Sequence, residues 1–394
     1  MPAHRRYLPA RRRRAAHLTL AGAAALGVAL LTPAAHGAVA DQGDHPYHAE
    51  LGRLSNVSDR FVASTIDPAT GGLNPYGVAV VPVTAGTLVK GDVLVGDFGN
   101  YANPGGAGQS IVQIDPATGA VSDWSHSATL DGVDSLSFNP KGFLWTGDLG
   151  PVGPSGTNDG SGGNVAIIGT SGQVAATFDA ATTGHGFFAG TWGQEYGKNS
   201  AGKVSFYWPD AGTGPDAGTV WRLDPNPGGT PNGQPTNATY ALLATLPAGG
   251  PTASVPTVRG PQGQAYDATT DTLYVADDAD NTVYAIPHAS VATGPATAQV
   301  VLRGGPLDAP QGIVQDPATG HLLVVNGANN NDIIDLSTAG KVLGVRDLAP
   351  NQPAGALFGL AIDPARTDRQ ATTVFYVNDN ENSLHELTIA NGDD

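Results

Sequence analysis

The sequence contains no cysteine among its 394 residues. That absence excludes disulfide bonds, thiolate nucleophiles, thiolate metal centres and a lipid-bearing cysteine. Charged residues make up only 14% of the chain, whereas coiled coils and helical bundles are rich in them. The 54 glycines and 30 prolines are instead typical of short strands joined by many turns. We therefore expect an all-β fold that depends on burial and strand pairing for its stability.

Basic residues are also scarce once the N-terminus is set aside. The chain has 19 Lys and Arg against 35 Asp and Glu, and six of the basic residues are arginines within the first 40 positions. The remaining 354 residues therefore hold 13 basic and 35 acidic side chains, a formal charge of −22. Such a surface repels nucleic acid and anionic lipid, so we expect neither as a partner.

Residues 1–40 are typical of an export signal. An Arg-rich segment from Arg5 to Arg14 precedes an apolar stretch, Ala15 to Leu31, and the small-residue site Ala38-Val39-Ala40. The apolar stretch is too short and too rich in Ala and Gly for a membrane span, which needs roughly 20 apolar residues. We expect a secreted, monomeric protein without a membrane anchor, cleaved near Ala40 after export by the general or the twin-arginine route.

One sequence motif recurs along the rest of the chain. A residue followed by Gly leads into an apolar run, and a second run, an Asp/Asn-rich turn and a third run follow. The copies start at Pro75-Tyr76-Gly77, Val133-Asp134-Ser135, His185-Gly186-Phe187, Pro261-Gln262-Gly263, Pro310-Gln311-Gly312 and Leu357-Phe358-Gly359. Their spacing of 47 to 76 residues is that of propeller blades.

The number of apolar runs predicts how the ring closes. Five units contain a fourth run, at 120–124, 173–178, 239–246, 299–302 and 341–345. The sixth has none, whereas an unmatched run from Arg60 to Ile66 precedes the first unit. We predict a six-bladed β-propeller of four-stranded antiparallel blades at 59–394, closed by this N-terminal strand and preceded by a lead segment at 41–58. Seven blades are the alternative.

This repeated motif resembles that of NHL-repeat propellers and of the wider six-bladed group that includes gluconolactonase-like and strictosidine-synthase-like proteins. The resemblance covers most of residues 60–389, and it implies a fold more directly than a function. Gluconolactonase-like proteins hold a divalent cation in their channel with Glu, Asn and Asp ligands. Their early Glu-Gly-Pro motif is not found here, because the first unit begins as Asn74-Pro75-Tyr76-Gly77.

In a four-stranded meander, the second turn and the start of the first strand lie on the same face. The second-turn residues are Asp97, Asp148, Asp210, Asp277, Asn326 and Asp379. They either bond the backbone of their own turns or form an acidic channel mouth. In the second case Asp134, Asp277 and Asn326 are candidate Ca²⁺ ligands. The candidate ligand-contacting residues of this mouth are Tyr76, Arg259, Gln262, Gln311 and Phe358.

No complete catalytic constellation is visible, and no organic cofactor is indicated. His185 and Glu195 are candidates for a base and its partner, since lyase-type propellers use His and Glu. The segment 192–202, with Trp192 and Glu195, is interpreted as a specificity loop, and Trp208 as packing between blades. We favour a secreted recognition or scaffold module for a small molecule, glycan or protein. The alternative is an extracellular metal-dependent lactonase, esterase or lyase.

Overall fold

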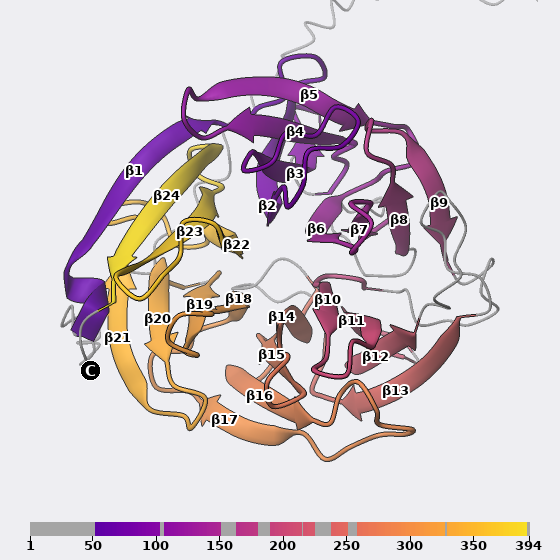
Figure 1. Cartoon of the computed structure of the whole chain (residues 1–394), viewed down its shortest axis with the longest axis vertical. Helices are drawn as coiled ribbons and strands as arrows, with labels where there is room; N and C mark the ends of the chain where they lie inside the picture. The colour runs from indigo at the N-terminus through magenta and orange to yellow at the C-terminus, as the bar shows by residue number, and fades with distance from the viewer. Residues whose placement is uncertain are drawn as a thin grey trace, which may run out of the picture. The chain divides into compact units, whose positions relative to one another are not determined.

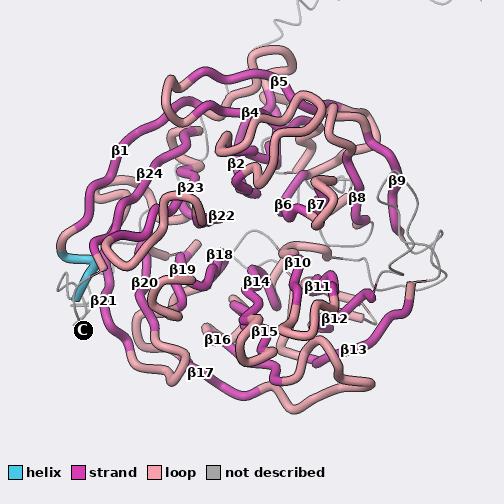
Figure 2. Tube along the Cα trace, viewed as in Figure 1, coloured by secondary structure: helices cyan, strands magenta, loops and turns pink. Residues whose placement is uncertain are grey.

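The computed structural model describes residues 52–102, 106–150, 163–179, 190–214, 216–224, 238–250, 258–327 and 329–391. These residues form six four-stranded antiparallel sheets and a short 3-10 helix, η1 (Gly52–Ser55). Figure 1 shows the sheets arranged as blades around a central axis, and Figure 2 shows how much of the ring is strand. The prediction of an all-β propeller with six blades is confirmed.

Within a blade the strands follow one another from the centre of the ring outward (Figure 1). Blade 1 contains β2 (Gly72–Val80), β3 (Val93–Asn100), β4 (Ser110–Asp115) and β5 (Ala120–His126). Blade 2 contains β6 (Val133–Phe138), β7 (Leu144–Asp148), β8 (Asn164–Ile168) and β9 (Val174–Phe178). Blade 3 contains β10 (Glu195–Lys198), β11 (Val204–Asp210), β12 (Thr219–Asp224) and β13 (Thr239–Thr245). Blades 4 and 5 contain β14 (Pro261–Asp267), β15 (Thr272–Asp277), β16 (Thr282–Pro287), β17 (Gln299–Arg303); and β18 (Pro310–Gln315), β19 (Leu322–Asn326), β20 (Asp332–Leu336), β21 (Val342–Asp347).

Blade 6 closes the ring with a strand from the other end of the chain. Its sheet has the order β1-β24-β23-β22, built from β22 (Leu357–Ile362), β23 (Ala371–Asn378), β24 (Ser383–Ala390) and β1 (Val57–Ser64). The antiparallel register of β1 and β24 runs from Val57 opposite Ile389 to Ser64 opposite Ser383. The predicted closing strand is confirmed, and it begins three residues earlier than the predicted run.

A buried ion-pair network fastens the segment before β1 to blades 5 and 6. The Arg53 guanidinium donates to Asp316 Oδ2 at 2.5 Å, to Asp335 Oδ2 at 2.6 Å and to Asn391 Oδ1 at 2.7 Å. The side chains of Arg53, Asp316 and Asp335 are 9%, 0% and 1% exposed. We call these four residues the latch. It adds bonds to charged groups where β1 joins the ring.

Apolar clusters between neighbouring blades form the core. Between blades 2 and 3 the cluster includes Trp145, Phe206 and Trp208, whose exposed fractions are 1%, 1% and 0%. The Trp145 and Phe206 rings are 4.5 Å apart between centroids. Trp208, which lies within β11, therefore packs between blades, as predicted.

The third blade begins later than the sequence suggested. The predicted start at 185–187 lies outside the described residues, and the innermost strand of this blade is β10, which pairs Glu195 with Tyr207 of β11. Trp192-Gly193 therefore takes the place that Gln262-Gly263 holds in blade 4. The interpretation of 192–202 as a specificity loop was wrong, because this segment contains β10 and its hairpin turn to β11.

Neighbouring blades approach each other so closely that they explain the glycines that follow Trp192, Gln262 and Phe358. A Cβ at Gly193 would lie 2.0 Å from the carbonyl oxygen of Gln262, and one at Gly263 would lie 2.4 Å from that of Gln311. At Gly359 it would lie 1.9 Å from the carbonyl oxygen of Tyr76. Real Cβ atoms do not approach backbone this closely, so the ring can tighten at this end only because these positions lack a side chain.

Candidate functional site

The second-turn carboxylates are buried within their own blades rather than gathered at an open mouth. Asp97, Asp148, Asp210, Asp277 and Asn326 are each 0% exposed. Asp148 accepts from the Asp131 N–H at 2.9 Å and from Asn164 Nδ2 at 3.1 Å. In blade 6 the equivalent residue is Asn378, which pairs with Leu357, and not Asp379 as predicted. These contacts support the interpretation in which the side chains bond local backbone and side-chain groups.

The three candidate calcium ligands do not fit a metal site. Asp277 Oδ1 accepts from the Ala279 N–H at 2.9 Å, and Asn326 Oδ1 accepts from the Asp308 N–H at 3.0 Å. Burial raises the pKa of Asp277 to about 8, and it raises the pKa of Asp134 well above its usual range, so both favour the uncharged form. Among the described residues, no three His, Asp or Glu side chains are grouped to hold a metal ion. Calcium binding stays a prediction without a fitting site here.

Two of the five predicted mouth residues, Tyr76 and Phe358, belong to a plug of aromatic side chains at this end of the channel. Tyr76 stacks on Phe358 with 3.8 Å between centroids and on Phe98 with 4.3 Å, and Trp192 meets Tyr76 edge-on at 5.2 Å. We call Tyr76, Phe98, Trp192 and Phe358 the plug. Since Tyr76 lies within β2 of blade 1 and Trp192 lies just before β10 of blade 3, the contact between them spans the channel.

Two of the predicted mouth residues support the plug from blades 4 and 5. Trp192 Nε1 donates to Gln311 Oε1 at 2.9 Å, and Gln311 Nε2 donates to Asp278 Oδ2 at 3.0 Å. Gln262 Nε2 donates to the Val258 carbonyl at 3.3 Å. Arg259 lies at the margin, where its Nε donates to the Gly250 carbonyl at 3.1 Å. These contacts fix the position of Trp192 at the end of the channel.

Beyond the plug, the channel is a cavity of about 1400 Å³ lined by the innermost strands of all six blades. The strand registers align its wall in three layers. From the plug outward these are Val78, Leu136, Gln194, Gln264, Ile313 and Leu360; then Ala79, Ser137, Glu195, Ala265, Val314 and Ala361; then Val80, Phe138, Tyr196, Tyr266, Gln315 and Ile362.

Polar groups of the two inner layers gather on one side of this wall. Ser137, Gln194, Glu195 and Gln264 come from blades 2, 3 and 4, and we call them the polar flank. Gln194 and Gln264 are 7% and 4% exposed, and among the described residues neither the amide nitrogen nor the oxygen of either side chain has a hydrogen-bond partner. In the other four blades the equivalent position is aliphatic. An amide is therefore not needed there for folding.

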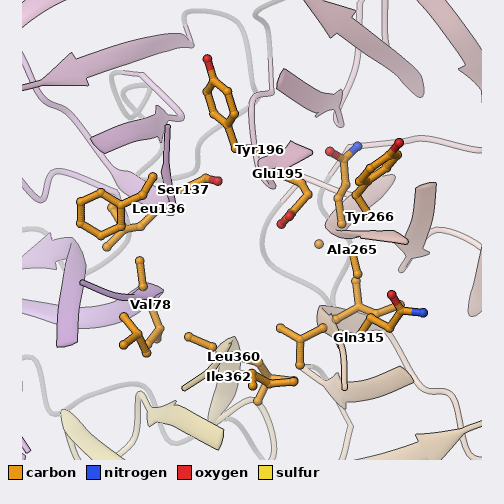
Figure 3. Close-up of a pocket in the computed structure, with 18 of the residues that line it drawn as sticks. Val78, Leu136, Ser137, Glu195, Tyr196, Ala265, Tyr266, Gln315, Leu360 and Ile362 are labelled. Atoms are coloured by element: carbon orange, nitrogen blue, oxygen red, sulfur yellow. The ribbon is translucent and has the colours of Figure 1, made fainter. Parts of the chain in front are cut away.

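Glu195 supplies the acidic group of the middle layer. Figure 3 shows its carboxyl group pointing into the cavity, whereas Tyr196 points away. Burial raises the pKa of Glu195 to about 8, because the surrounding protein disfavours the charged form although the channel admits solvent to the side chain. At neutral pH the carboxyl group is mostly protonated, so it can donate a hydrogen bond as well as accept one.

Sequence reasoning identified Glu195 but missed Trp192 as a plug residue and missed both glutamines. Aligning Trp192-Gly193-Gln194 with Gln262-Gly263-Gln264 would have revealed all three. The third start was placed at His185-Gly186 because Phe187-Phe188 continues as an apolar run, which Glu195-Tyr196-Gly197-Lys198 does not. His185 lies outside the described residues, so its pairing with Glu195 stays a prediction.

A second group of reactive residue types lies where β1 meets β24. Ser383 Oγ is 3.0 Å from His385 Nε2, and His385 Nδ1 is 3.4 Å from Asp59 Oδ1, which is the order of a hydrolase triad. Ser383 is only 1% exposed, and the Tyr376 ring stacks on the imidazole at 4.9 Å. A hydroxyl buried in this way does not reach a substrate, so these residues support the ring closure.

Solved structures share this fold. A nutrient-binding protein from Bacteroides thetaiotaomicron is 11% identical with a TM-score of 0.55, over 84% of this chain and 76% of its own. A gluconolactonase from Xanthomonas campestris is 15% identical with a TM-score of 0.50, over 83% of this chain and 88% of its own. A carbohydrate-active enzyme from Trichoderma reesei, solved as its calcium structure, is 9% identical with a TM-score of 0.50, over 84% and 95%.

These identities establish a common fold and not a common activity. No protein-family model matches the chain, and no curated protein matches it in sequence. The predicted resemblance to gluconolactonase-like propellers is confirmed at the level of the fold. No helix in the described part of the chain is long and apolar enough to cross a bilayer.

Proposed function

We propose that the protein is a recognition propeller that binds a small molecule in its central channel. The ligand enters from the face that carries the turns between the first and second strands of the blades, opposite the plug. The unpartnered amides of Gln194 and Gln264 are the observation that supports this function most directly. A buried polar group without a partner costs about 1–3 kcal/mol, so two of them facing one cavity favour a ligand that completes their bonds.

The shape of the cavity agrees with this function. Its volume of about 1400 Å³ exceeds that of most small molecules, and one end is filled by plug side chains. A ligand inserted from the open end would meet the polar flank before it reached Trp192. The predicted export signal makes the proposed binding an extracytoplasmic event. A nutrient-binding protein with this fold is a precedent for ligand recognition.

A panel of small molecules tests this function. We would measure the melting temperature with sugars, polyols, neutral amphiphiles, amines and carboxylic acids, using the protein and its Gln194→Leu/Gln264→Leu variant. We expect at least one class to raise the melting temperature of the parent with saturation and to leave the variant unchanged. Equal shifts in both proteins, or none in either, would refute a channel site.

A second candidate function is general acid–base catalysis, which the position of Glu195 favours. Its carboxyl group points into a cavity, and its pKa of about 8 lies close to neutral pH, where a proton donor and acceptor works best. This corresponds to the predicted hydrolase or lyase. We derive no metal-assisted step, because the candidate calcium ligands do not fit a metal site.

Turnover assays with lactone and ester substrates distinguish the two functions. For an enzyme, Glu195→Gln lowers kcat by at least about 100-fold, because the amide neither gives up nor takes a proton under these conditions. For a recognition module there is no turnover to lose, and the same variant still binds. Turnover that survives in Glu195→Gln would exclude this carboxyl group as the catalytic residue.

A further inference from the structure

The channel wall is polar on one side and apolar on the other. Opposite the polar flank, blades 5, 6 and 1 contribute only aliphatic side chains to the inner two layers, and we call this set the apolar flank: Val78, Ala79, Ile313, Val314, Leu360 and Ala361. Figure 3 shows Val78 and Leu360 across the cavity from Glu195. A ligand that fits must therefore present different surfaces to the two sides.

The apolar flank continues outward along blade 1 to the rim. The segment from Val78 to Val83 lines the cavity without a charged side chain, and Val83 at its outer end is 46% exposed. In blade 6, Ile362 extends the same surface outward from Leu360 and Ala361. Hydrocarbon can therefore remain in contact with protein over the whole depth of the channel.

The unpartnered polar atoms lie at the inner end of the channel. Gln194 and Gln264 belong to the layer next to the plug, and Asp134 Oδ2 is also buried without a partner in the described part of the chain. A Cβ at Gly147 would lie 2.1 Å from Asp134 Oδ1 and 2.7 Å from Gln194 Nε2, so these two atoms are at most 4.8 Å apart. Together they offer several donors and acceptors within the reach of one small polar group.

We propose that the channel binds an uncharged amphiphile, with its hydroxyl or amide head against Gln194 and Gln264 and its hydrocarbon body along the apolar flank. This inference rests on the proposed recognition function and specifies its ligand class. The head enters first and the hydrocarbon extends toward the rim. Such an orientation pairs each unpartnered amide and covers the apolar flank in one binding event.

The charges of the wall favour an uncharged head. Lys90, Lys198 and His321 line the cavity only outside the three layers, which contain no Lys, Arg or His to neutralise a carboxylate or phosphate. Asp134 lies close to Gln194. A cationic head would require an ionised partner, whereas burial raises the pKa of Glu195 to about 8. A neutral head needs no change in protonation at pH 7, and it can use both the donors and the acceptors of the amides.

Four probes that differ in their head group or in the presence of an eight-carbon chain test the ligand class. They are 1-O-octylglycerol, glycerol, octanoate and octylammonium, titrated into the protein at pH 7 by calorimetry below the micellar concentration. Each buried methylene changes affinity about fourfold, so we expect octylglycerol to bind at least about 100-fold more tightly than glycerol. We expect both ionic probes to bind at least about tenfold more weakly than octylglycerol.

Three variants locate the head. Gln194→Leu/Gln264→Leu should weaken octylglycerol binding about tenfold or more, and the single variant Gln264→Leu provides the same test if the double variant folds poorly. The exposed Gln370→Leu is the matched control and should leave binding unchanged.

Several outcomes would overturn the inference while the proposed function survives. One is tight octylammonium binding that Glu195→Gln abolishes, which would show a cation site. Another is equal affinity for glycerol and octylglycerol, which would show that the apolar flank is not used. Failure of all four probes, with saturable binding of a sugar from the panel, would also reject the amphiphile. Absence of binding by every class would reject the proposed function itself.

Discussion

The latch and the polar flank differ in whether their buried polar groups have hydrogen-bond partners. Around Arg53, two carboxylates and an amide accept bonds from one guanidinium at 2.5 to 2.7 Å. Around Gln194 and Gln264, two amides of similar burial have no partner. The first arrangement holds the chain end in the ring, and the second leaves bonding capacity for a molecule from outside. A buried polar group is thus informative only once its partners are known.

The two regions also respond to pH in opposite directions. Although burial alone would raise it, the bonds from Thr372 and Arg53 hold the pKa of Asp316 below its usual value. The stability that Asp316 provides is therefore present at neutral pH and is lost as the pH falls through its lowered pKa. Glu195, with a pKa raised by burial to about 8, contributes stability below its unfolded pKa of about 4.5 that is lost as the pH rises toward 8.

Removal of the closing segment should have the largest effect. Deleting residues 52–64 removes the latch arginine and β1, and it exposes the backbone edge of β24 together with the contacts of Val62 and Ala63. We expect a loss of more than about 5 kcal/mol, aggregation, or both. Size-exclusion chromatography and thermal melting of a chain beginning at Gly52 provide the reference. A deletion that melts like this reference would show that β1 is dispensable.

Breaking the latch alone should have a smaller but clear effect. Arg53→Met leaves Asp316 and Asp335 buried without their cation, which costs about 3–5 kcal/mol for pairs of this kind. Denaturant unfolding measures the change. The control is Arg60→Met, which breaks a pair with Glu386 in which the arginine side chain is 48% exposed, and it should cost less than about 1 kcal/mol. Similar losses in both variants would refute the special role of the latch.

The polar flank should respond to substitution in the opposite direction. Gln264→Leu replaces an unpartnered amide with a side chain like Leu360 at the equivalent position, so we expect a gain of about 1–3 kcal/mol in the free energy of unfolding. Gln113→Leu is the control, because Gln113 is also buried but donates to Asp92 Oδ2 at 2.6 Å. The control should lose stability. A loss in Gln264→Leu as well would mean that this amide has a structural partner.

The smallest effect should be a pH-dependent one at Glu195. We expect Glu195→Gln and the parent to be about equally stable at pH 5, and the variant to be more stable by roughly 1–2 kcal/mol at pH 8.5. The gain is smaller than full burial would give, because the channel admits solvent. Unfolding curves across this pH range measure it. A constant difference between the proteins would contradict the raised pKa.

The fold was predictable because its signals are local and repeated. Five blades have a Gly where neighbouring blades meet, all six have a buried Asp or Asn at the second turn, and the unmatched run before the first blade revealed the closure. Blade 3 was misplaced because β10 consists of Glu195-Tyr196-Gly197-Lys198, which does not form the apolar run found in the other copies. The departure from the pattern is also where the polar flank lies.

The candidate site was less predictable because it depends on which buried side chains lack hydrogen-bond partners. The residues before each Gly were expected to form a mouth, yet Tyr76, Trp192 and Phe358 pack on one another and fill it. The sequence shows that Gln311 precedes its Gly and that Gln264 follows one. It does not show that Gln311 bonds Trp192 and Asp278, or that the Gln264 side chain has no hydrogen-bond partner among the described residues. Only three-dimensional placement separates a satisfied amide from an unsatisfied one.

The pairing of β1 with β24 also sets the order in which the chain can mature. Arg60 and its partner Glu386 are 326 positions apart, so a ribosome makes one long before the other. Five sheets can form during synthesis, but β1 has no strand to join until Ser383 to Ala390 have emerged. Contacts of such long range form slowly, and the waiting edge can pair with the wrong chain. A transcript cut short before β24 would yield a protein with two open edges, which is a natural substrate for proteolysis.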